Sequence, residues 1–531
     1  MSKTLALFSD GTGNSAAKAQ GTNVRRLYEA VDRSPLGAEQ VTFYDDGVGT
    51  ESIKPIRLLG GAFGYGITRN LEDLYGFLLR HYVPGDKVLL FGFSRGAFTV
   101  RCLANILWYV GLPDPDGNLP EELKALAKEA IRAYKKRAPG DRDSKAPRDF
   151  REKYHGREVP IEMLGVWDTV EAVGLPIHEL TEALRQAIPL HLQTIPARYR
   201  KPGGMSVESD FNPLIKSAYH ALSIDDERRT FHPLLIQEDN KCAGRVEQVW
   251  FAGVHSNVGG GYPKDGLAYI TMRWMAHRAQ DHGLILSKAQ VQAFADMADI
   301  DDNLYDSRSG FGVFYRYAPR PIGDLCAEAG VVPHIHASAI ERVRRRTEDY
   351  APHVIPPNAV VAQAPDGFPG AGDAVLREQL LRPCDSLVRT GRLQYLTFFW
   401  LCCFFAVLLL EAPCRLPLPS WLASFLAVPE GWGVSVARYF LPVWAANRLA
   451  AVAAVPGWMT LFALAGLVLL VWTRAVDAYM GNLCSAAWEK SFGKKISPLP
   501  PRPWYVVFAS SVGDPIRRLL KRRAPSLGAG G

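Results

Sequence analysis

The sequence predicts an α/β fold with a mostly parallel sheet, followed by a C-terminal pair of membrane-spanning helices. Three observations lead to this prediction. Short apolar runs typical of buried parallel strands alternate with segments that suit helices. Polar or glycine-rich residues follow several of these runs, at the edge where α/β sheets place their functional groups. After about residue 390, two long uncharged runs replace this alternation.

Gly92-Phe-Ser-Arg-Gly96 is the most informative motif. It follows the apolar run Lys87-Val-Leu-Leu-Phe91 and precedes a helix-compatible stretch, residues 97–110. A strand, a sharp G-x-S-x-G turn and a helix make the nucleophile elbow of an α/β hydrolase. A Cβ at Gly92 or Gly96 would crowd the strand or the helix. The motif therefore predicts an α/β-hydrolase-like sheet with Ser94 as its nucleophile, at the positive end of the helix.

Two later strand ends supply partners for that serine. Hydrolases of this architecture provide them in the order Ser, Asp or Glu, His. The predicted strand 161–166 leads into Asp168, and the predicted strand 246–251 leads into His255, at the start of a glycine-rich loop. We therefore predict a catalytic triad of Ser94, Asp168 and His255.

Four other histidines are weaker candidates for the base. His220 lies in a segment that suits a helix interior, where a packed histidine is the usual role. His232 stands beside a proline, and no predicted strand leads into His334 or His336.

Backbone N–H groups near the nucleophile are the expected donors to the oxyanion of acyl transfer. The first is the N–H of Arg95. The second is assigned to Gly11 or Thr12, in the turn after the first predicted strand, residues 4–8. Asp10 is expected to organise this turn by accepting backbone hydrogen bonds. The alternatives for the turn are a phosphate-cradling loop or a plain tight turn.

Several motifs together resemble the bacterial DUF2235 family of α/β hydrolases, which includes the type VI secretion phospholipase effectors of the Tle1 type. The matching stretches are Phe8-Ser-Asp-Gly-Thr-Gly-Asn14, Tyr44-Asp-Asp-Gly-Val-Gly-Thr50, Gly92-Phe-Ser-Arg-Gly-Ala97, Gly165-Val-Trp-Asp-Thr169, Ala218-Tyr-His-Ala-Leu222, Gly253-Val-His-Ser-Asn-Val-Gly-Gly-Gly-Tyr262, 306–310 and 336–342. The resemblance covers residues 1–356. It implies that Ser94, Asp168 and His255 are the catalytic triad, and that the substrates are carboxylic esters of phospholipids. One departure is Asn257, where the family often has Asp, and this puts a role for a charge there in doubt.

Two segments are expected to be helical insertions in a hydrolase domain of residues 1–356. Residues 114–157 are rich in charge and helix formers, and residues 175–235 hold an amphipathic helix candidate at 178–187. The second insertion is expected to act as a lid that forms a wall of an acyl-chain pocket. The glycine-rich stretch 60–66 is expected to be a mobile loop.

Residues 393–472 are expected to form a two-helix membrane hairpin with an interfacial connection, after a linker at 357–392. The first run, 393–410, would span roughly 27 Å at 1.5 Å per residue. The second run is 449–472. Two buried core helices are the alternative. The tail, 473–531, holds ten Lys or Arg residues.

Basic residues on both flanks of the hairpin predict cytoplasmic ends and a bacterial inner membrane location. The alternative is a secreted effector that acts on a target-cell membrane. The net charge of +7 comes largely from the tail and suits anionic headgroups, so a membrane is the expected partner and nucleic acid is not. The eight cysteines show no C-x-x-C spacing, and neither a metal nor a cofactor is expected. A secretion-system or immunity partner is left open.

The function that these residues predict is a serine esterase or lipase of the phospholipase A type. Ser94 attacks the ester carbonyl, His255 accepts its proton, and Asp168 holds the His255 tautomer.

Two other classes stay open. A metal-dependent phosphohydrolase would use Asp10, Asp45 and Asp46, but Phe8 stands where that motif needs a nucleophilic aspartate. A non-catalytic, membrane-anchored binding protein is the other alternative.

Overall fold

The computed structural model describes most of the first 362 residues and two helical segments beyond them. The described residues are 2–11, 21–33, 35, 38–46, 62–114, 120–170, 211–238, 244–309, 315–362, 389–398, 400–402 and 458–492. The chain divides into two units. One comprises Met1–Gln379 with Trp488–Gly531, and the other comprises Leu380–Ala487.

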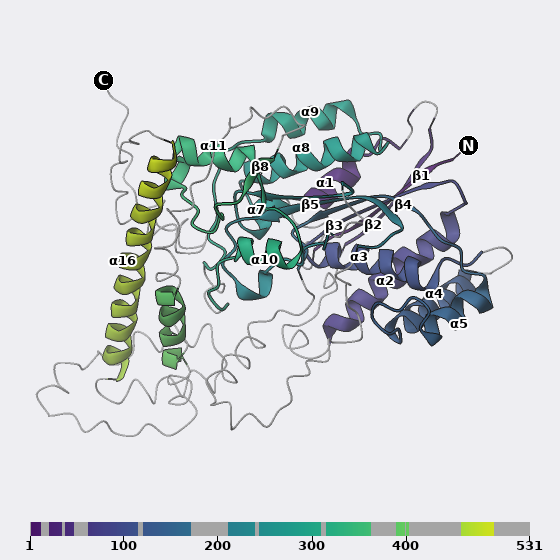
Figure 1. The fold of residues 1–531 in the computed structure, drawn as a ribbon, viewed down its shortest axis with the longest axis horizontal. Helices are drawn as coiled ribbons and strands as arrows, with labels where there is room; N and C mark the ends of the chain where they lie inside the picture. The colour runs from purple at the N-terminus through teal and green to yellow at the C-terminus, as the bar shows by residue number, and fades with distance from the viewer. Residues whose placement is uncertain are drawn as a thin grey trace, which may run out of the picture. The chain divides into compact units, whose positions relative to one another are not determined.

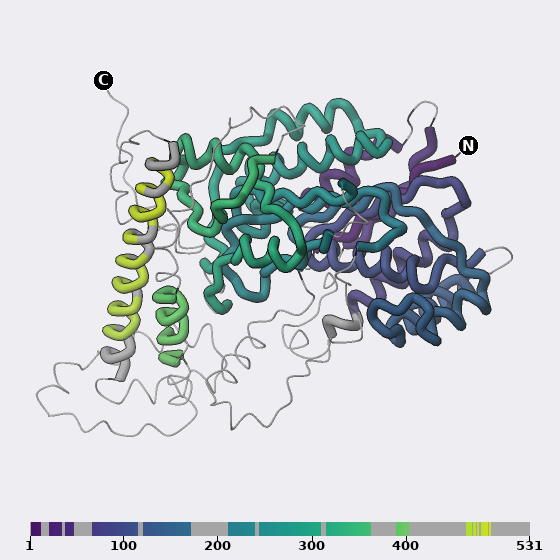
Figure 2. Tube along the Cα trace, viewed as in Figure 1, coloured from purple at the N-terminus to yellow at the C-terminus, as the bar shows by residue number. Residues whose placement is uncertain are grey.

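The first unit is built on one sheet, with strand order β2-β1-β3-β4-β5-β6-β7-β8 in the described residues. Every neighbouring pair is parallel. The strands are β1 (Thr4–Ser9), β2 (Gln40–Asp45), β3 (Lys87–Phe93), β4 (Ile161–Trp167), β5 (Ile215–Ser223), β6 (Val246–Phe251), β7 (His334–His336) and β8 (Val360–Ala362). Figure 2 follows the N-terminal strand into the sheet, where it lies between β2 and β3. The predicted α/β fold with a mostly parallel sheet is confirmed.

Helices cover both faces of this sheet (Figure 1), as a parallel sheet requires. Helices α1, α8 and α9 lie on one side, and α2, α3, α4 and α5 lie on the other. The longer helices are α1 (Asn23–Ala30), α2 (Ala62–His81), α3 (Arg95–Val110), α4 (Pro120–Lys135), α5 (Lys145–Tyr154), α8 (Gly266–Asp281), α9 (Lys288–Met297) and α11 (Ala337–Arg345). Shorter helical segments are η4 (Arg229–Phe231), α7 (His255–Gly259), α10 (Ile322–Glu328) and η6 (Thr347–Asp349).

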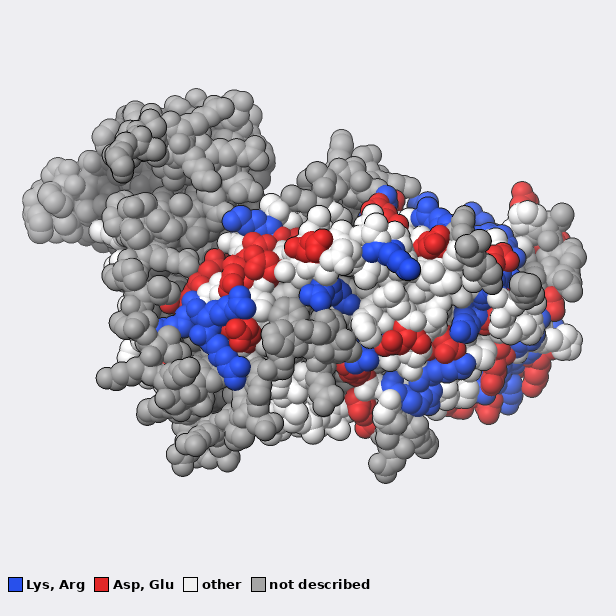
Figure 3. Space-filling model, turned by 90° about the horizontal axis from the view of Figure 1, so that it is seen from above, with Lys and Arg blue, Asp and Glu red and all other residues white. Residues whose placement is uncertain are grey.

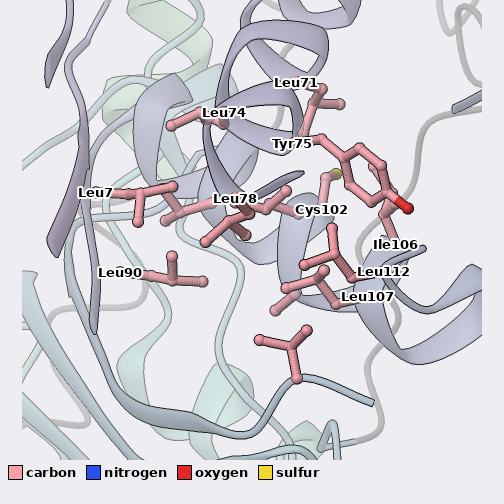
Figure 4. Close-up of a cluster of buried hydrophobic side chains, with 14 of the residues drawn as sticks. Leu7, Leu71, Leu74, Tyr75, Leu78, Leu90, Cys102, Ile106, Leu107 and Leu112 are labelled. Atoms are coloured by element: carbon pink, nitrogen blue, oxygen red, sulfur yellow. The ribbon is translucent and has the colours of Figure 1, made fainter. Parts of the chain in front are cut away.

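Side chains of the central strands are buried alternately in two cores. Leu7 and Leu90 join the core under α2 and α3, where Leu74 and Leu78 meet them (Figure 4). Phe8 and its neighbours on the opposite face join the core under α1 and α8. A fully buried leucine or phenylalanine contributes about 1.5–3 kcal/mol, so these two cores fix the register of the central strands.

Two predictions of local structure are wrong. Residues 215–223 form strand β5, although they lie in a segment expected to be a helical insertion. This strand is largely buried between β4 and β6, so its sequence lacks the polar alternation that marks a half-exposed strand. The stretch 60–66 was expected to be a loop, but α2 begins at Ala62. Residues 171–210, which include the amphipathic candidate 178–187, lie outside the described residues.

The expected membrane hairpin is not supported. Among the described residues, no helix is long and apolar enough to cross a membrane. The long helix α16 (Trp458–Phe492) carries Arg474 near its middle. Residues 403–457 and the basic tail from 493 onward lie outside the described residues.

Charged side chains of both signs share the molecular face in Figure 3. Lys and Arg lie beside Asp and Glu over the described residues of this face. The described residues include ion pairs such as Arg345 with Asp301 at 2.8 Å. The net charge of +7 therefore does not produce a single basic surface on the described part of this face.

Candidate active site

Three strand ends bring Ser94, Asp168 and His255 to the carboxyl edge of the sheet. Ser94 directly follows β3 and Asp168 directly follows β4, the neighbouring strand. The parallel ladder continues past the strands, because the Ser94 N–H donates to Trp167 O at 3.0 Å and the Asp168 N–H to Ala221 O at 2.8 Å. His255 begins the short helix α7, shortly after β6, at the position where the sequence predicts the start of a glycine-rich loop.

The turn at Ser94 has the geometry of a nucleophile elbow. Ser94 has φ 58° and ψ −120°, a region that residues with a side chain rarely adopt. Gly92 and Gly96 make this turn possible. A Cβ on Gly92 would lie 2.6 Å from Gly96 O, and one on Gly96 would overlap the carbonyl of Ser9. The second glycine therefore lets the start of α3 approach the end of β1.

A continuous chain of hydrogen bonds links the three side chains. His255 Nε2 lies 2.8 Å from Ser94 Oγ, and His255 Nδ1 lies 2.5 Å from Asp168 Oδ2. The exposed fractions of the three residues are 7% for Ser94, 4% for His255 and 0% for Asp168. The rings of Phe93 and Phe231 lie 4.6 and 5.1 Å from the imidazole and shield it from water.

The protonation states of the pair suit a base with an ionised partner. Burial lowers the pKa of His255, although the hydrogen bond to Asp168 opposes this effect. A neutral His255 at neutral pH can accept the proton of Ser94. Burial alone would raise the pKa of Asp168, but the charge and hydrogen bonds of Arg320, with a contribution from His255, hold it well below its usual value.

Arg320 is the residue of this site that the sequence did not reveal. Its Nη1 donates to Asp168 Oδ1 at 2.6 Å, and its Nη2 donates to Asp168 Oδ2 at 2.7 Å. The two residues are 152 positions apart, and both side chains are fully buried. Only the composition around Arg320, an arginine between two prolines, marks this position in the sequence, and that signal is too weak to predict an ion pair.

Two further groups hold the backbone around His255. Asp226 Oδ2 accepts the His255 N–H at 3.2 Å and pairs with Arg228 at 2.6 Å. Asn257 Oδ1 accepts the N–H groups of Val254 and Tyr305, and its amide donates to the backbone of residue 303. A neutral amide that both donates and accepts fits these contacts. Asn257 therefore links the backbone at Val254 to residues 303 and 305 without needing a charge.

The structure gives a different result for each of the three residues predicted to supply an oxyanion donor. Arg95 is the first residue of α3, where a helix leaves its first N–H groups without intrahelical acceptors. The Gly11 N–H donates to Asp10 Oδ1 at 2.6 Å and is therefore directed away from an oxyanion. Thr12 lies outside the described residues.

Asp10 organises the end of β1, as expected of a supporting residue. Its side chain is 2% exposed and accepts from Thr22 Oγ1 at 2.5 Å, from Tyr44 Oη at 2.7 Å and from Gly11 N–H. Burial raises the pKa of Asp10 to about 6, although these hydrogen bonds oppose the rise.

Two of the aspartates proposed for metal-dependent chemistry, Asp10 and Asp45, have different side-chain donors. Asp45 Oδ2 accepts from Ser9 Oγ at 2.9 Å and from Asn70 Nδ2 at 2.6 Å, whereas Asp10 has its own donors. No group of three His, Cys, Asp or Glu side chains that could hold a metal ion occurs among the described residues.

Three of the four rival histidines, His220, His232 and His336, have other partners. His220 lies in β5, where its Nε2 accepts the Thr169 N–H at 3.1 Å and burial lowers its pKa to about 3. His232 Nε2 lies 2.8 Å from the carbonyl of residue 318. His334 and His336 begin and end β7, a strand that the sequence did not reveal, and His336 Nδ1 lies 2.8 Å from Ser338 Oγ.

Comparisons with known proteins place these residues in a family. The family described as "T6SS, Phospholipase effector Tle1-like, catalytic domain" matches residues 3–278, about half of the chain. This range contains Ser94, Asp168 and His255, but not Arg320. A curated relative is the uncharacterized protein YEL023C of Saccharomyces cerevisiae, which is 28% identical over an alignment of 193 residues that covers 33% of this chain and 27% of the relative.

Two solved structures resemble parts of the chain. One is the crystal structure of an uncharacterized protein from Pseudomonas aeruginosa, with 20% identity and a TM-score of 0.33, covering 55% of this chain and 47% of that one. The other is the Tle1 effector bound to the VgrG spike from the type 6 secretion system, with 18% identity and a TM-score of 0.27, covering 50% and 52%. The chain spans about a quarter of the curated relative and about half of each solved chain. On the family match, the chain belongs to the family of Tle1-like phospholipase effector catalytic domains.

Proposed function

We propose that the chain is a serine hydrolase that cleaves a carboxylic ester of a membrane phospholipid through an acyl-enzyme. The observation that carries this proposal is the hydrogen-bonded chain from Ser94 Oγ through His255 to Asp168, at 2.8 and 2.5 Å. The strained backbone of Ser94 and the neutral, buried state of His255 add to it. Membership of a phospholipase family supports the substrate class.

The proposed reaction follows from these positions. Ser94 Oγ attacks the ester carbonyl as His255 Nε2 accepts its proton, and the Arg95 N–H stabilises the oxyanion. The second oxyanion donor is assigned to Thr12, since the Gly11 N–H is bonded to Asp10. His255 then protonates the leaving alcohol, and water activated by the same imidazole releases the fatty acid. Asp168 keeps Nδ1 protonated throughout.

Product analysis tests this proposal. Phosphatidylethanolamine and phosphatidylglycerol vesicles are incubated with the native chain and with Ser94→Ala, and the lipids are analysed by mass spectrometry. The proposal predicts free fatty acid with the matching lysophospholipid, and a loss of turnover of at least about 10⁴-fold in Ser94→Ala. Release of a phosphorylated headgroup, or equal turnover by both proteins, would overturn it.

We also propose that the protein acts as a secreted effector on a target-cell membrane, with a secretion-system component as its partner. The family description, which names a type VI secretion effector, supports this proposal over residence in an inner membrane. A bacterial strain that expresses the chain in its periplasm should lose viability, whereas the Ser94→Ala strain should grow. Equal growth of both strains would contradict a toxic role.

A further inference from the structure

We infer that Arg320 is a positioning residue of the site, a fourth member that holds Asp168 ionised and in place so that Asp168 can orient His255. The inference rests on the proposed function, because it assigns Arg320 to the same relay. It also extends the site beyond the matched family region, which ends at residue 278.

Both terminal nitrogens of the Arg320 guanidinium donate to two acceptors each. Besides its two bonds to Asp168, Nη1 donates to Ser223 O at 2.7 Å and Nη2 donates to Phe231 O at 2.7 Å. These carbonyls belong to the last residue of β5 and to η4. A planar guanidinium with two acceptors on each terminal nitrogen has one orientation, so it fixes the plane of the Asp168 carboxylate.

The segment before Arg320 is anchored to the neighbouring chain. Ala318 N–H donates to Glu227 O at 2.8 Å, Arg229 N–H donates to Arg316 O at 3.0 Å, and Tyr317 forms an antiparallel bridge with Arg228. This bridge places the start of the 315–362 segment against the chain that carries Asp226. The segment after the matched family region therefore contributes directly to the site.

Asp168 requires such a cation because water does not reach it. Its other donors are Ser223 N–H at 3.0 Å, Ser223 Oγ at 3.4 Å and His255 Nδ1. A fully buried carboxyl with only these neutral donors would tend to take up a proton. A protonated Asp168 could no longer hold the Nδ1–H tautomer of His255, and Ser94 would lose its base.

A second buried arginine shows what a purely structural role looks like. Arg342 is also fully buried, and its donors go to the carbonyls of Ile300 and Asp302 and to the carboxylate of Glu348. These contacts join α11 to the loop after α9 and to η6, and none of them is made to Ser94, Asp168 or His255. Arg342→Met is therefore the matched control for the loss of a buried guanidinium.

The test measures how fast a fluorophosphonate labels Ser94 between pH 5 and 9 in the native chain, Arg320→Met, Arg320→Lys and Arg342→Met. In Arg320→Met, Asp168 either takes up a proton or, if ionised, holds the proton of His255 more tightly. Both effects move the acid limb of the profile to higher pH, by about 1 to 3 units. On the acid limb itself, labelling should fall by about 10-fold for each unit of this shift, less than the 10⁴-fold loss that follows removal of an orienting carboxylate.

Other charged groups near the relay stay the same in all four proteins. They are Asp225, Asp226, Arg228, His220 and His232. A difference between the Arg320 variants and the control therefore reports on Arg320. Arg320→Lys retains the charge and should keep the acid limb near its native position while labelling more slowly. Added methylguanidinium should restore part of the labelling of Arg320→Met.

Three outcomes overturn the inference. One is a native pH profile in Arg320→Met, and another is the same shift of the acid limb in Arg342→Met. The third applies if Arg320→Met does not fold. In that case a native labelling rate for Arg320→Lys shows that the planar guanidinium of Arg320 has no role in the site. If the native chain hydrolyses lipid and Arg320→Met has the native pH profile, only this inference is rejected. If the native chain neither hydrolyses lipid nor is labelled, the proposed function is rejected as well.

Discussion

Two buried aspartates follow the strands on either side of β3, and their pKa values are shifted in opposite directions. Asp10 follows β1 and Asp168 follows β4, the two neighbours of β3. Both are almost completely buried, yet the pKa of Asp10 rises to about 6 while that of Asp168 falls below its usual value. Asp10 has only neutral donors, whereas Asp168 has Arg320. Burial therefore favours the protonated form of both carboxyl groups, and the buried cation Arg320 reverses this effect at Asp168.

The largest expected effect is on activity. Under the proposed function, Asp168→Asn removes the carboxylate that orients His255, and turnover should fall by about 10⁴-fold, the loss known for the equivalent change in a serine protease. Asp10→Asn perturbs only the turn after β1, and its loss should stay below the roughly 10²- to 10³-fold cost of one oxyanion donor. Steady-state kinetics with a soluble ester measures both variants. Equal losses of turnover in the two variants would contradict the view that Asp168, and not Asp10, orients His255.

The next effect concerns stability. Arg320→Met leaves the charge of Asp168 buried and uncompensated, which costs about 3–5 kcal/mol in comparable buried pairs. Adding Asp168→Asn removes that charge, so the double variant should be more stable than the sum of the single losses by about 2–3 kcal/mol. Urea unfolding of the four proteins measures this coupling. The same cycle with Asp10→Asn should give none, and a coupling there would show that Arg320 acts on both aspartates.

Asp10 should also give a pH-dependent loss of stability. Its folded pKa of about 6 lies above the ordinary aspartate pKa of 3.8, so the folded chain holds a proton that the unfolded chain releases between those values. The free energy of unfolding therefore falls as pH rises from about 4 to 6, by about 1.4 kcal/mol for each pH unit that separates the two pKa values. Asp10→Asn lacks this contribution. Its stability relative to the native chain should rise by up to about 3 kcal/mol between pH 4 and 7 in urea unfolding.

The smallest expected effect is the loss of the hydrogen bond from Tyr44 to Asp10. Tyr44→Phe removes one donor to the Asp10 carboxylate and should cost about 1 kcal/mol of stability at pH 7. Because the Tyr44 hydroxyl lowers the pKa of Asp10, its loss should extend the pH window of falling stability above pH 6. Urea unfolding of this variant at pH 6, 7 and 8 measures the extension. An unchanged window would mean that this hydrogen bond does not act on the ionised carboxylate.

The sequence predicted the order and strand-end positions of Ser94, Asp168 and His255, because each follows an apolar run that is locally recognisable. It also predicted the need for Gly92 and Gly96, since a G-x-S-x-G turn leaves no space for a Cβ at either position. These features depend on local patterns, and local patterns are visible in a single chain.

Features that depend on distant partners could not be predicted. The pairing of Arg320 with Asp168 results from the docking of two segments 152 residues apart. Strand β5 was missed because a strand buried on both faces shows no alternation of polar and apolar residues. The uncharged run before Arg474 was interpreted as membrane-spanning, but no helix among the described residues is long and apolar enough to cross a membrane.

Fluorophosphonate labelling at pH 8, followed by peptide mapping, tests the central claim that Ser94 is activated by His255 and the ionised Asp168. The account predicts one adduct, on Ser94, that is lost in His255→Ala and strongly reduced in Asp168→Asn. A folded native chain without an adduct, or an adduct on Ser94 that forms equally fast in His255→Ala, would contradict it.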